Sequence, residues 1–182
     1  ANMELECDQE VPSVEVTATD NCTQQLVVSL DASTETMDCG SVFTRTWSVS
    51  DACGNTTTAT QVITFVDTTN PTVTEGVPAE LTIECDQQAP FYMPSFADNC
   101  DDSLSISAIS GISNVNPCGY DIERAWTAAD NCGNSTTVYQ VIHVVDTTNP
   151  VLVGVPANTQ VECNMVPAPA EVSATDNCSD AT

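Results

Sequence analysis

The sequence predicts an all-β protein, a tandem array of immunoglobulin-like antiparallel β-sandwich domains that each carry two disulfides. Three observations support this prediction: a repeat of about 78 residues, short segments in which apolar and polar residues alternate, and ten cysteines without a Cys-x-x-Cys pair. The 182 residues are enough for one or two ordinary domains. No stretch has the apolar periodicity of a helix.

The repeat is defined by its cysteines. Cys7, Cys85 and Cys163 are spaced by 85 − 7 = 78 and 163 − 85 = 78 residues, and Cys39 and Cys118 by 118 − 39 = 79. The motif "DTTNP" closes one repeat and opens the next at Pro71 and Pro150. We therefore expect three segments: residues 1–70 as a repeat that lacks its first strand, 71–149 as a complete repeat, and 150–182 as the start of a third, all part of a longer tandem protein.

Each repeat shows the same order of predicted strands. The segments "AELTIEC" and "PSVEVTATD" alternate apolar and polar residues, and "QLVVSL" or "LSISAIS" follows. Next come "SVFTRTWSVSD", matched by "YDIERAWTAAD", and "TATQVITFVD", matched by "TVYQVIHVVD". Turn signals separate these segments: "DNC", "PCG" and "CGN". Six or seven short strands in one repeat indicate a two-sheet sandwich.

The immunoglobulin scheme also predicts which cysteines pair. In that scheme "EC" ends strand A, "DNC" lies between strands B and C, "CG" begins strand F, and "CGN" is the F–G turn. The A–B and E–F connections share one end of a sandwich, and B–C and F–G share the other. The predicted bridges are therefore Cys7–Cys39, Cys85–Cys118, Cys22–Cys53 and Cys100–Cys132, with partners for Cys163 and Cys178 beyond residue 182.

Charge and cysteine content exclude several classes of protein. With 26 acidic residues, two arginines and no lysine, the formal charge of −24 disfavours nucleic acid and anionic membranes as partners. No apolar stretch is long enough to cross a bilayer. Ten cysteines and a single histidine, His143, favour disulfides in an oxidising compartment over zinc binding.

The order of motifs resembles a known family of repeats. "DTTNP", "VEC", "ATDNC", "CG", Arg-x-Trp and "CGN" follow one another as in the HYR-like, immunoglobulin-like tandem repeats of very large secreted proteins of Bacteroidota, and the resemblance covers the whole chain. Those proteins are often surface adhesins, including gliding-type adhesins, exported by the type 9 secretion pathway. The resemblance implies an extracellular protein at the cell surface. The extra "DNC" and "CGN" cysteines depart from a plain HYR module.

Calcium is the cofactor that the acidic loops suggest. Strand G ends at Asp67 and Asp146, where the B–C and F–G loops of the following repeat are expected to lie. Hard oxygen ligands from both sides could gather there, as calcium requires. The alternative is that these Asp and Asn residues only form turns. The candidate calcium ligands are Asp67, Asp98, Asn99, Asp101, Asp130, Asn134, Asp146 and Asp176.

Glycosylation is a second candidate modification. The resemblance implies the bacterial O-glycosylation pattern of Asp, then Ser or Thr, then an apolar residue or Thr. "DTT" fits it twice and "DSL" once, so the candidate acceptors are Thr68, Thr147 and Ser103. Two of these three positions are equivalent in successive repeats.

A catalytic function is not expected. His143 aligns with Thr64 of the preceding repeat, and no paired base accompanies the many hydroxyls. Arg45 and Arg124 each precede a tryptophan by two residues, on one face of a strand, which favours a structural role for the arginine over ligand binding.

The predicted function is that of a non-enzymatic extracellular structural array, forming a stalk, adhesin or filament at the bacterial cell surface. Its expected partners are neighbouring repeats of the chain, further copies that associate into fibres through open strand edges, and surface or glycan ligands. The alternative is a carbohydrate-binding module of a secreted protein. That function needs an exposed aromatic platform, but Phe91 and Tyr92 are not repeated in the other units.

Overall fold

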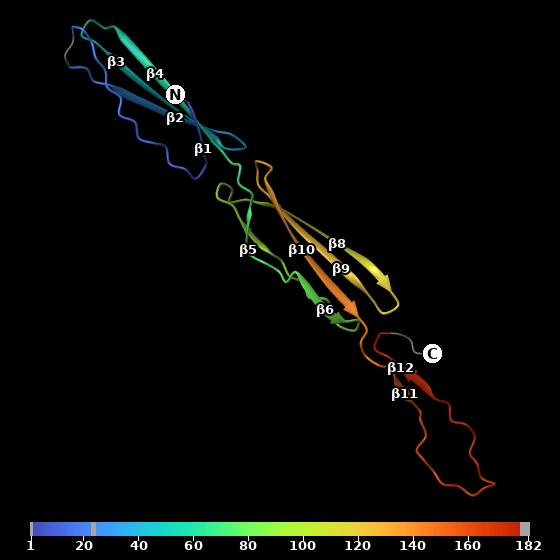
Figure 1. The fold of residues 1–182 in the computed structure, drawn as a ribbon. Coiled ribbons are helices and arrows are strands. Elements are labelled where there is room, and N and C mark those ends of the chain that lie inside the picture. Colours follow the sequence, from blue (N-terminus) through green and yellow to red (C-terminus); the bar gives the residue numbers. More distant parts are fainter. Residues whose placement is uncertain (1, 23–24, 179–182) are drawn as a thin grey trace. The chain divides into compact units, whose positions relative to one another are not determined.

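The structure, a computed structural model, describes residues 2–22 and 25–178 and divides the chain into two compact units (Figure 1). Unit 1 comprises Ala1–Gly76, Pro94–Ser107 and Thr127–Thr137, and unit 2 comprises Val77–Met93, Ala108–Trp126 and Val138–Thr182. These units do not coincide with the sequence repeats, because unit 1 includes residues 71–76, 94–107 and 127–137 of the second repeat.

The described residues form β-strands and no helix, so the predicted all-β, immunoglobulin-like fold is confirmed. One four-stranded sheet has the order β1-β4-β3-β2, and a second has the order β6-β10-β9-β8. The first sheet is built from β1 (Met3–Glu6), β2 (Ser29–Thr36), β3 (Ser41–Ser50) and β4 (Thr56–Val66). The second is built from β6 (Glu80–Glu84), β8 (Ser105–Asn116), β9 (Gly119–Ala129) and β10 (Ser135–Val145).

Two smaller sheets complete the described strands. In unit 1, β5 (Thr72–Glu75) pairs antiparallel with β7 (Ser95–Ala97), with a register shift between Val73 and Glu75. In unit 2, β11 (Val151–Val153) pairs antiparallel with β12 (Ser173–Thr175). Pro71, Pro94 and Pro150 directly precede β5, β7 and β11, which confines where these short strands begin.

The prediction of wholly antiparallel sheets was wrong at one position in each large sheet. β1 pairs with β4 in parallel, with Met3 opposite Ile63, and β6 pairs with β10 in parallel, with Leu81 opposite Ile142. Because this first strand runs alongside the last strand of its own sheet, its cysteine reaches the same end as the "DTTNP" segment. That placement sets up the site described below.

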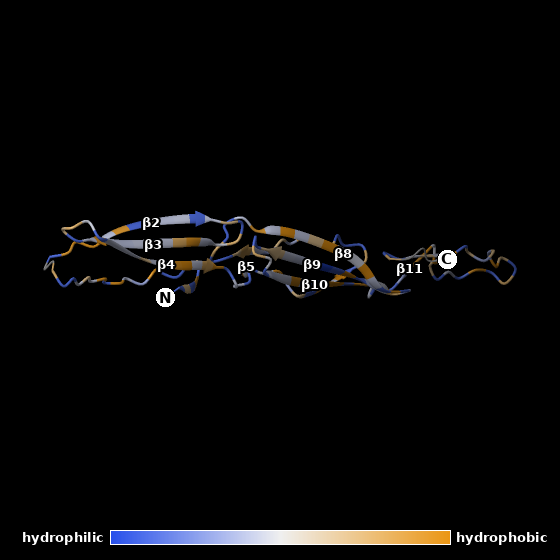
Figure 2. Ribbon diagram, turned by 90° about the horizontal axis from the view of Figure 1, so that it is seen from above, coloured by the Kyte–Doolittle hydropathy of each residue, from blue (hydrophilic) through white to orange (hydrophobic). Residues whose placement is uncertain are grey.

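The buried apolar residues lie on the central strands β4, β9 and β10. Trp126 is 1% exposed, and Ile63, Ala128 and Ile142 are fully buried. The edge strands β2 and β8 are exposed along almost their whole length. Figure 2 shows apolar positions interspersed with polar ones along β8, and Ile109, Ile112 and Val115 are all exposed there.

The glycine of the "CG" motif is required for steric reasons. Gly40 has φ +88°, and a Cβ atom on it would lie 2.1 Å from the backbone oxygen of Phe65 at the end of β4. Gly119 makes the same approach to Val144 at the end of β10. Only glycine allows both this backbone conformation and this closeness. The motif therefore fixes the start of β3 and β9 against the neighbouring strand.

Candidate functional site

The disulfides join different cysteines from those predicted. Cys7 pairs with Cys100, Cys39 with Cys132, and Cys85 with Cys178, with Cα–Cα distances of 5.7, 4.9 and 5.6 Å. All three distances fit disulfide geometry. The predicted bridges within a repeat, Cys7–Cys39, Cys85–Cys118, Cys22–Cys53 and Cys100–Cys132, were therefore wrong, as was the expectation that Cys178 finds its partner beyond residue 182.

The disulfide pairing is explained by which cysteine-bearing loops lie opposite one another. Cys7 and Cys39 do lie at one end of the first sheet, and both line a hollow of about 410 Å³ in unit 1. The "DNC" and "CGN" loops of the second repeat line the same hollow through Cys100 and Cys132. Each cysteine thus bonds the cysteine that faces it across the hollow, and the bridges link one repeat to the next.

Four cysteines have no disulfide partner among the described residues, and all four are exposed. They are Cys22, Cys53, Cys118 and Cys163. Each of them has an equivalent cysteine in another repeat that forms a disulfide. These four differ from their bridged equivalents in having no disulfide partner among the described residues.

The repeated "D-N-C" and "D-x-C-G-N" motifs form side-chain-capped turns. The Asp98 carboxylate oxygen Oδ1 accepts hydrogen bonds from the backbone N–H groups of Cys100 (2.8 Å) and Asp101 (3.1 Å). Asp130 accepts from the N–H of Cys132 (2.8 Å) and of Asn134 (2.9 Å) in the same way. These turns present the cysteine for bonding, so the turn-forming role considered for these residues is real.

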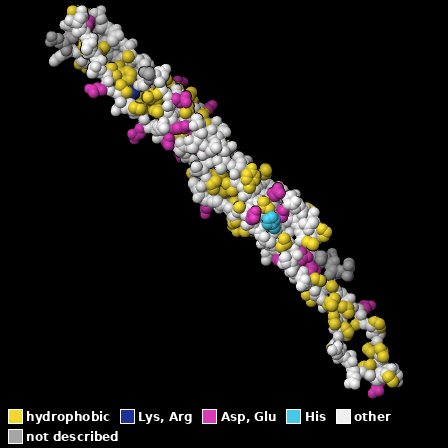
Figure 3. All heavy atoms as spheres, viewed as in Figure 1, with side chains coloured by type: hydrophobic (Ala, Val, Ile, Leu, Met, Phe, Trp, Pro, Cys, Tyr) yellow, Lys and Arg dark blue, Asp and Glu magenta, His cyan; other side chains and the backbone are white. Residues whose placement is uncertain are grey.

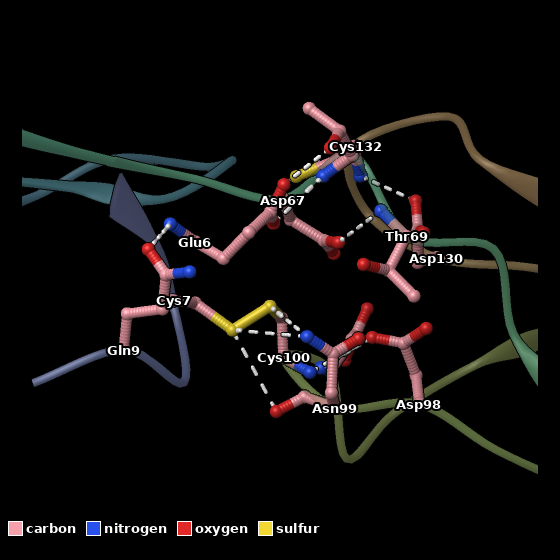
Figure 4. Close-up of a disulfide and its surroundings, with 12 residues drawn as sticks. Glu6, Cys7, Gln9, Asp67, Thr69, Asp98, Asn99, Cys100, Asp130 and Cys132 are labelled. Carbon is pink, nitrogen blue, oxygen red and sulfur yellow. Dashed lines mark hydrogen bonds between the residues drawn. A yellow bond between two sulfur atoms is a disulfide. The ribbon is translucent and has the colours of Figure 1, made fainter. Parts of the chain in front are cut away.

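Several carboxylates converge beside these turns in unit 1. Figure 4 shows Glu6, Asp67, Asp98 and Asp130 near the Cys7–Cys100 disulfide. Carboxylate oxygens of Glu6 and Asp67 lie within 4.8 Å of each other, as do those of Asp67 and Asp130. Asn134 donates a hydrogen bond from its Nδ2 to the Asp67 carbonyl (3.1 Å), which ties the turn to the end of β4.

Asp67 is the buried centre of this cluster. It is 7% exposed, and burial together with the negative charges of Asp98, Asp130 and Glu6 raises its pKa above the usual value. Its Oδ1 accepts a hydrogen bond from the Thr69 N–H (3.1 Å). The second oxygen of Asp98, Oδ2, is buried without a hydrogen-bond partner. A cation at this place would relieve both features.

The donor set fits a hard cation better than a soft one. Cys100 and Cys132 lie within reach of the carboxylates, but their sulfurs are bonded to Cys7 and Cys39 and are not thiolates. The oxygens of Glu6, Asp67, Asp98 and Asp130 remain, and oxygen donors of this kind suit calcium. Glu6 was missed by the sequence analysis, although a Glu precedes the cysteine at the same place in each repeat, as Glu84 and Glu162 show.

The other candidate ligands lie apart from this cluster or serve the turns. Asp101 serves the turns, since it accepts from the N–H of Ser103 (2.7 Å) and of Asn131 (3.0 Å). Asn99 is exposed, and its Nδ2 lies 3.2 Å from the Cys100 sulfur. In unit 2, Asp146 lies with Glu84 and the Cys178 sulfur, while Asp176 accepts from the Cys178 N–H (2.9 Å).

The candidate glycosylation acceptors are exposed but two of them are hydrogen-bonded. The Thr68 hydroxyl donates to Glu6, and the Thr147 hydroxyl donates to Glu84 in unit 2. The same glutamates accept from the backbone N–H of each threonine at 3.2 Å. Ser103 is exposed, and its N–H is held by Asp101.

The two arginines have the structural role expected. Arg45 is 7% exposed, donates through Nε to Gln61 (2.8 Å) and through its terminal nitrogens to the Pro12 carbonyl (3.1 Å). Its guanidinium lies 5.2 Å from the ring centre of Trp47. Arg124 donates a hydrogen bond from one terminal nitrogen to the Pro90 carbonyl (2.6 Å), and its guanidinium lies 5.5 Å from the ring centre of Phe91.

His143 is held by an acidic neighbour. Its Nδ1 lies 2.7 Å from Asp121 Oδ1, and the pKa of Asp121 is lowered by hydrogen bonds from Asn114 and His143. Figure 3 shows this histidine beside acidic side chains, which are otherwise scattered along the chain. The pair ties β9 to β10 at the surface.

An all-β chain whose repeats are linked by disulfides and turn-forming "DNC" and "CGN" motifs belongs to the class of immunoglobulin-like repeat proteins. Its family is the HYR-like domain with 4 cysteines, which matches residues 1–65 and 69–144 and to which the chain therefore belongs. Domains of this kind are typically non-catalytic, adhesion-type and usually extracellular. A search of curated proteins gave no match.

The solved structures that this chain matches include two cadherin structures. Drosophila N-cadherin EC1-4 is 9% identical, with a TM-score of 0.35, and the match covers 79% of this chain and 47% of that one. A protocadherin gammaB7 EC3-6 cis-dimer structure is 14% identical, with a TM-score of 0.35, and the match covers 82% and 52%. The chain thus spans about half the length of these structures. Among the described residues, no helix has the length and apolar character to span a bilayer.

Proposed function

We propose that the chain is part of an extracellular structural array that forms a stalk, adhesin or filament at the surface of a bacterial cell. The observation that carries this proposal is that the bridges Cys7–Cys100, Cys39–Cys132 and Cys85–Cys178 join successive repeats. Disulfides persist in oxidising, extracellular compartments. We take residues 1–70, 71–149 and 150–182 as successive copies of one repeat in this array.

Electron microscopy of the native protein on its cells tests this role. Antibodies against the chain, coupled to gold, should label threads or fibres outside the cell envelope. Label confined to the cell interior would contradict the proposal. Ordered fibres with a constant repeat would favour a filament, whose subunits could pair through the exposed edge strands β2 and β8. Single thin threads would favour a stalk.

We propose calcium as the ligand of the Glu6, Asp67, Asp98 and Asp130 cluster. The support is the raised pKa of buried Asp67 and the buried, unpartnered Oδ2 of Asp98. Bound calcium would neutralise this charge and hold the end of β4 against the turns of the next repeat. Asp146, Asp176 and Glu84 are proposed to serve the equivalent place in unit 2.

Thermal melting with calcium or with chelator tests the site. Calcium should raise the melting temperature of the native chain and of Asp51→Asn, but not of Asp67→Asn. Asp51 is a matched control because it is the equivalent of Asp130 in the first repeat, 130 − 51 = 79 residues earlier, and is held by Asn55. In chelator at neutral pH, Asp67→Asn should melt higher than the native chain, because it removes a buried negative charge. Identical melting of the native chain with and without calcium would rule out the site.

We also propose O-linked glycans on Thr68, Thr147 and Ser103, which are exposed in the structure. Modification of either threonine would replace its hydroxyl hydrogen bond to Glu6 or Glu84. Intact mass of the protein purified from its own cells, compared with the mass of the sequence, measures this directly. A mass equal to that of the unmodified chain contradicts the proposal.

Carbohydrate binding is the second candidate function, favoured by one observation. Phe91 is 73% exposed and the adjacent Tyr92 is 38% exposed, although Arg124 lies against the Phe91 ring. Exposed aromatic rings can stack on sugars. Binding to a glycan array that is lost in Phe91→Ala and kept in Phe43→Ala would support this function, and no binding to any glycan would remove it.

A further inference from the structure

The three disulfides follow one rule. Each joins a cysteine to the one 93 residues later in the following repeat, which is one repeat length of 78 plus 93 − 78 = 15 residues. Two rows of bonds result. The first row joins "EC" to "DNC" cysteines, as in Cys7–Cys100 and Cys85–Cys178, and the second joins "CG" to "CGN" cysteines, as in Cys39–Cys132.

This connectivity shortens the covalent path along the array. From Cys7 the path crosses to Cys100, returns along the backbone to Cys85, and crosses again to Cys178. The return segment is only 100 − 85 = 15 residues, although each repeat holds 78. A fully extended segment of this length spans about 50 Å. In the second row the corresponding segment, Cys118 to Cys132, is 132 − 118 = 14 residues.

We propose that these two rows of disulfides form a covalent ladder that makes the array nearly inextensible under tension. Force applied along the chain passes through the bridges and the short return segments. Among the strands after Cys7, β7 lies in the return segment 85–100 and β9 in the return segment 118–132. The other strands that follow Cys7 and the "DTTNP" segments lie outside both return segments, so their unfolding or cleavage does not lengthen or sever the array. A bridge closed inside each repeat would leave every junction as a single backbone strand. The inference rests on connectivity and does not depend on the surface role proposed above.

The same rule accounts for the four cysteines without partners. Cys118 and Cys163 belong to the "CG" and "EC" types, which bond to a cysteine 93 residues later in the chain. Cys22 and Cys53 belong to the "DNC" and "CGN" types, which bond to a cysteine 93 residues earlier. Neighbouring repeats of the same kind would therefore continue both rows. In protein purified from its own cells, alkylation under denaturing, non-reducing conditions should label none of these four. Labelling of all four would confine the ladder to the bridges within this chain.

Single-molecule force spectroscopy tests the ladder. The 182-residue chain is placed between reference domains, its unpaired thiols are blocked, and it is pulled from both ends. With the observed bridges, only residues 1–7, 85–100 and 178–182 lie on the shortest covalent path. The extended chain should therefore reach a contour length of about 100 Å, and about 630 Å after reduction.

Variants and alternative pairings give different lengths. Cys85→Ser removes one rung, so the path includes residues 1–7 and 100–182 and should lengthen to about 310 Å. The matched control Cys163→Ser changes an unpaired cysteine of the same type and should leave the length unchanged. Bridges inside each repeat would give about 420 Å in the unsubstituted chain and would overturn the ladder. That outcome would also remove the inter-repeat bridges as support for the surface role, but electron microscopy tests that role separately.

Discussion

Removal of the Cys39–Cys132 bridge should destabilise unit 1 strongly. With Cys7–Cys100 intact, the second bridge closes a ring made of the segments 7–39 and 100–132, about 64 residues in all. In the chain-entropy model, a ring of that size corresponds to about 4 kcal/mol of stability. The double variant Cys39→Ser/Cys132→Ser should therefore melt at least about 10 °C lower than the native chain. The equivalent unpaired position, Cys118→Ser, should have almost no effect.

Thiol counting in the same variants identifies the pairing independently of stability. The observed pairing leaves four thiols in the native chain, and still four in Cys39→Ser/Cys132→Ser, because both partners are removed together. In Cys7→Ser/Cys39→Ser the count should rise to six, since Cys100 and Cys132 lose their partners. Mass spectrometry after alkylation gives these counts. Two thiols in the native chain and two in Cys7→Ser/Cys39→Ser would show that the bridges lie within repeats, and would refute the reasoning.

Three further predictions concern single side chains. Gly40→Ala should cost more than Gly54→Ala in chemical unfolding: both have φ near +88°, which costs about 1–3 kcal/mol for alanine, but only Gly40 also meets the Phe65 backbone. Equal costs would show that the "CG" contact is not needed. Trp126→Ala should lose about 3–5 kcal/mol because the side chain is 1% exposed, whereas Trp47→Ala, which is half-buried, should lose less. Asp121 has a lowered pKa, so its contribution to stability is present above its unfolded value of 3.8 and is lost as pH falls below it. Asp121→Asn should therefore reduce the loss of melting temperature between pH 5 and pH 2, and an unchanged acid profile would contradict the hydrogen bonds of Asp121 with Asn114 and His143.

The repeated cysteine spacing and the alternating segments were enough to predict the class of fold and the long strands of the two large sheets. The predicted strand at "PSVEVTATD" was wrong, because residues 12–20 form no strand. Local chemistry determines the features that were predicted correctly: alternation sets which face of β4 and β10 is buried, and Asp, Asn and Gly set the turns at Asp98 and Gly40. The end of the sheet at which each cysteine lies was also predictable. Cys7 and Cys39 do share an end, as do Cys100 and Cys132.

Only the tertiary structure decided which of these cysteines bond. Cysteine spacing does not distinguish a bridge within a repeat from a bridge between repeats, because every repeat carries the same four types of cysteine. The choice depends on which loops meet, and the turns at Cys100 and Cys132 lie across the hollow from Cys7 and Cys39.

The members of the carboxylate cluster were likewise only partly predictable from the sequence. Asp67, Asp98 and Asp130 could be selected from the sequence, since each belongs to a repeated motif at a predicted junction. Glu6 could not be weighted above the other acidic residues, because its place beside Asp67 follows from the parallel pairing of β1 with β4. The burial that raises the pKa of Asp67 is likewise a property of the packed unit. Sequence thus determined the strands and turns of this protein, whereas its bridges and its charged cluster were decided by which surfaces meet when the repeats fold.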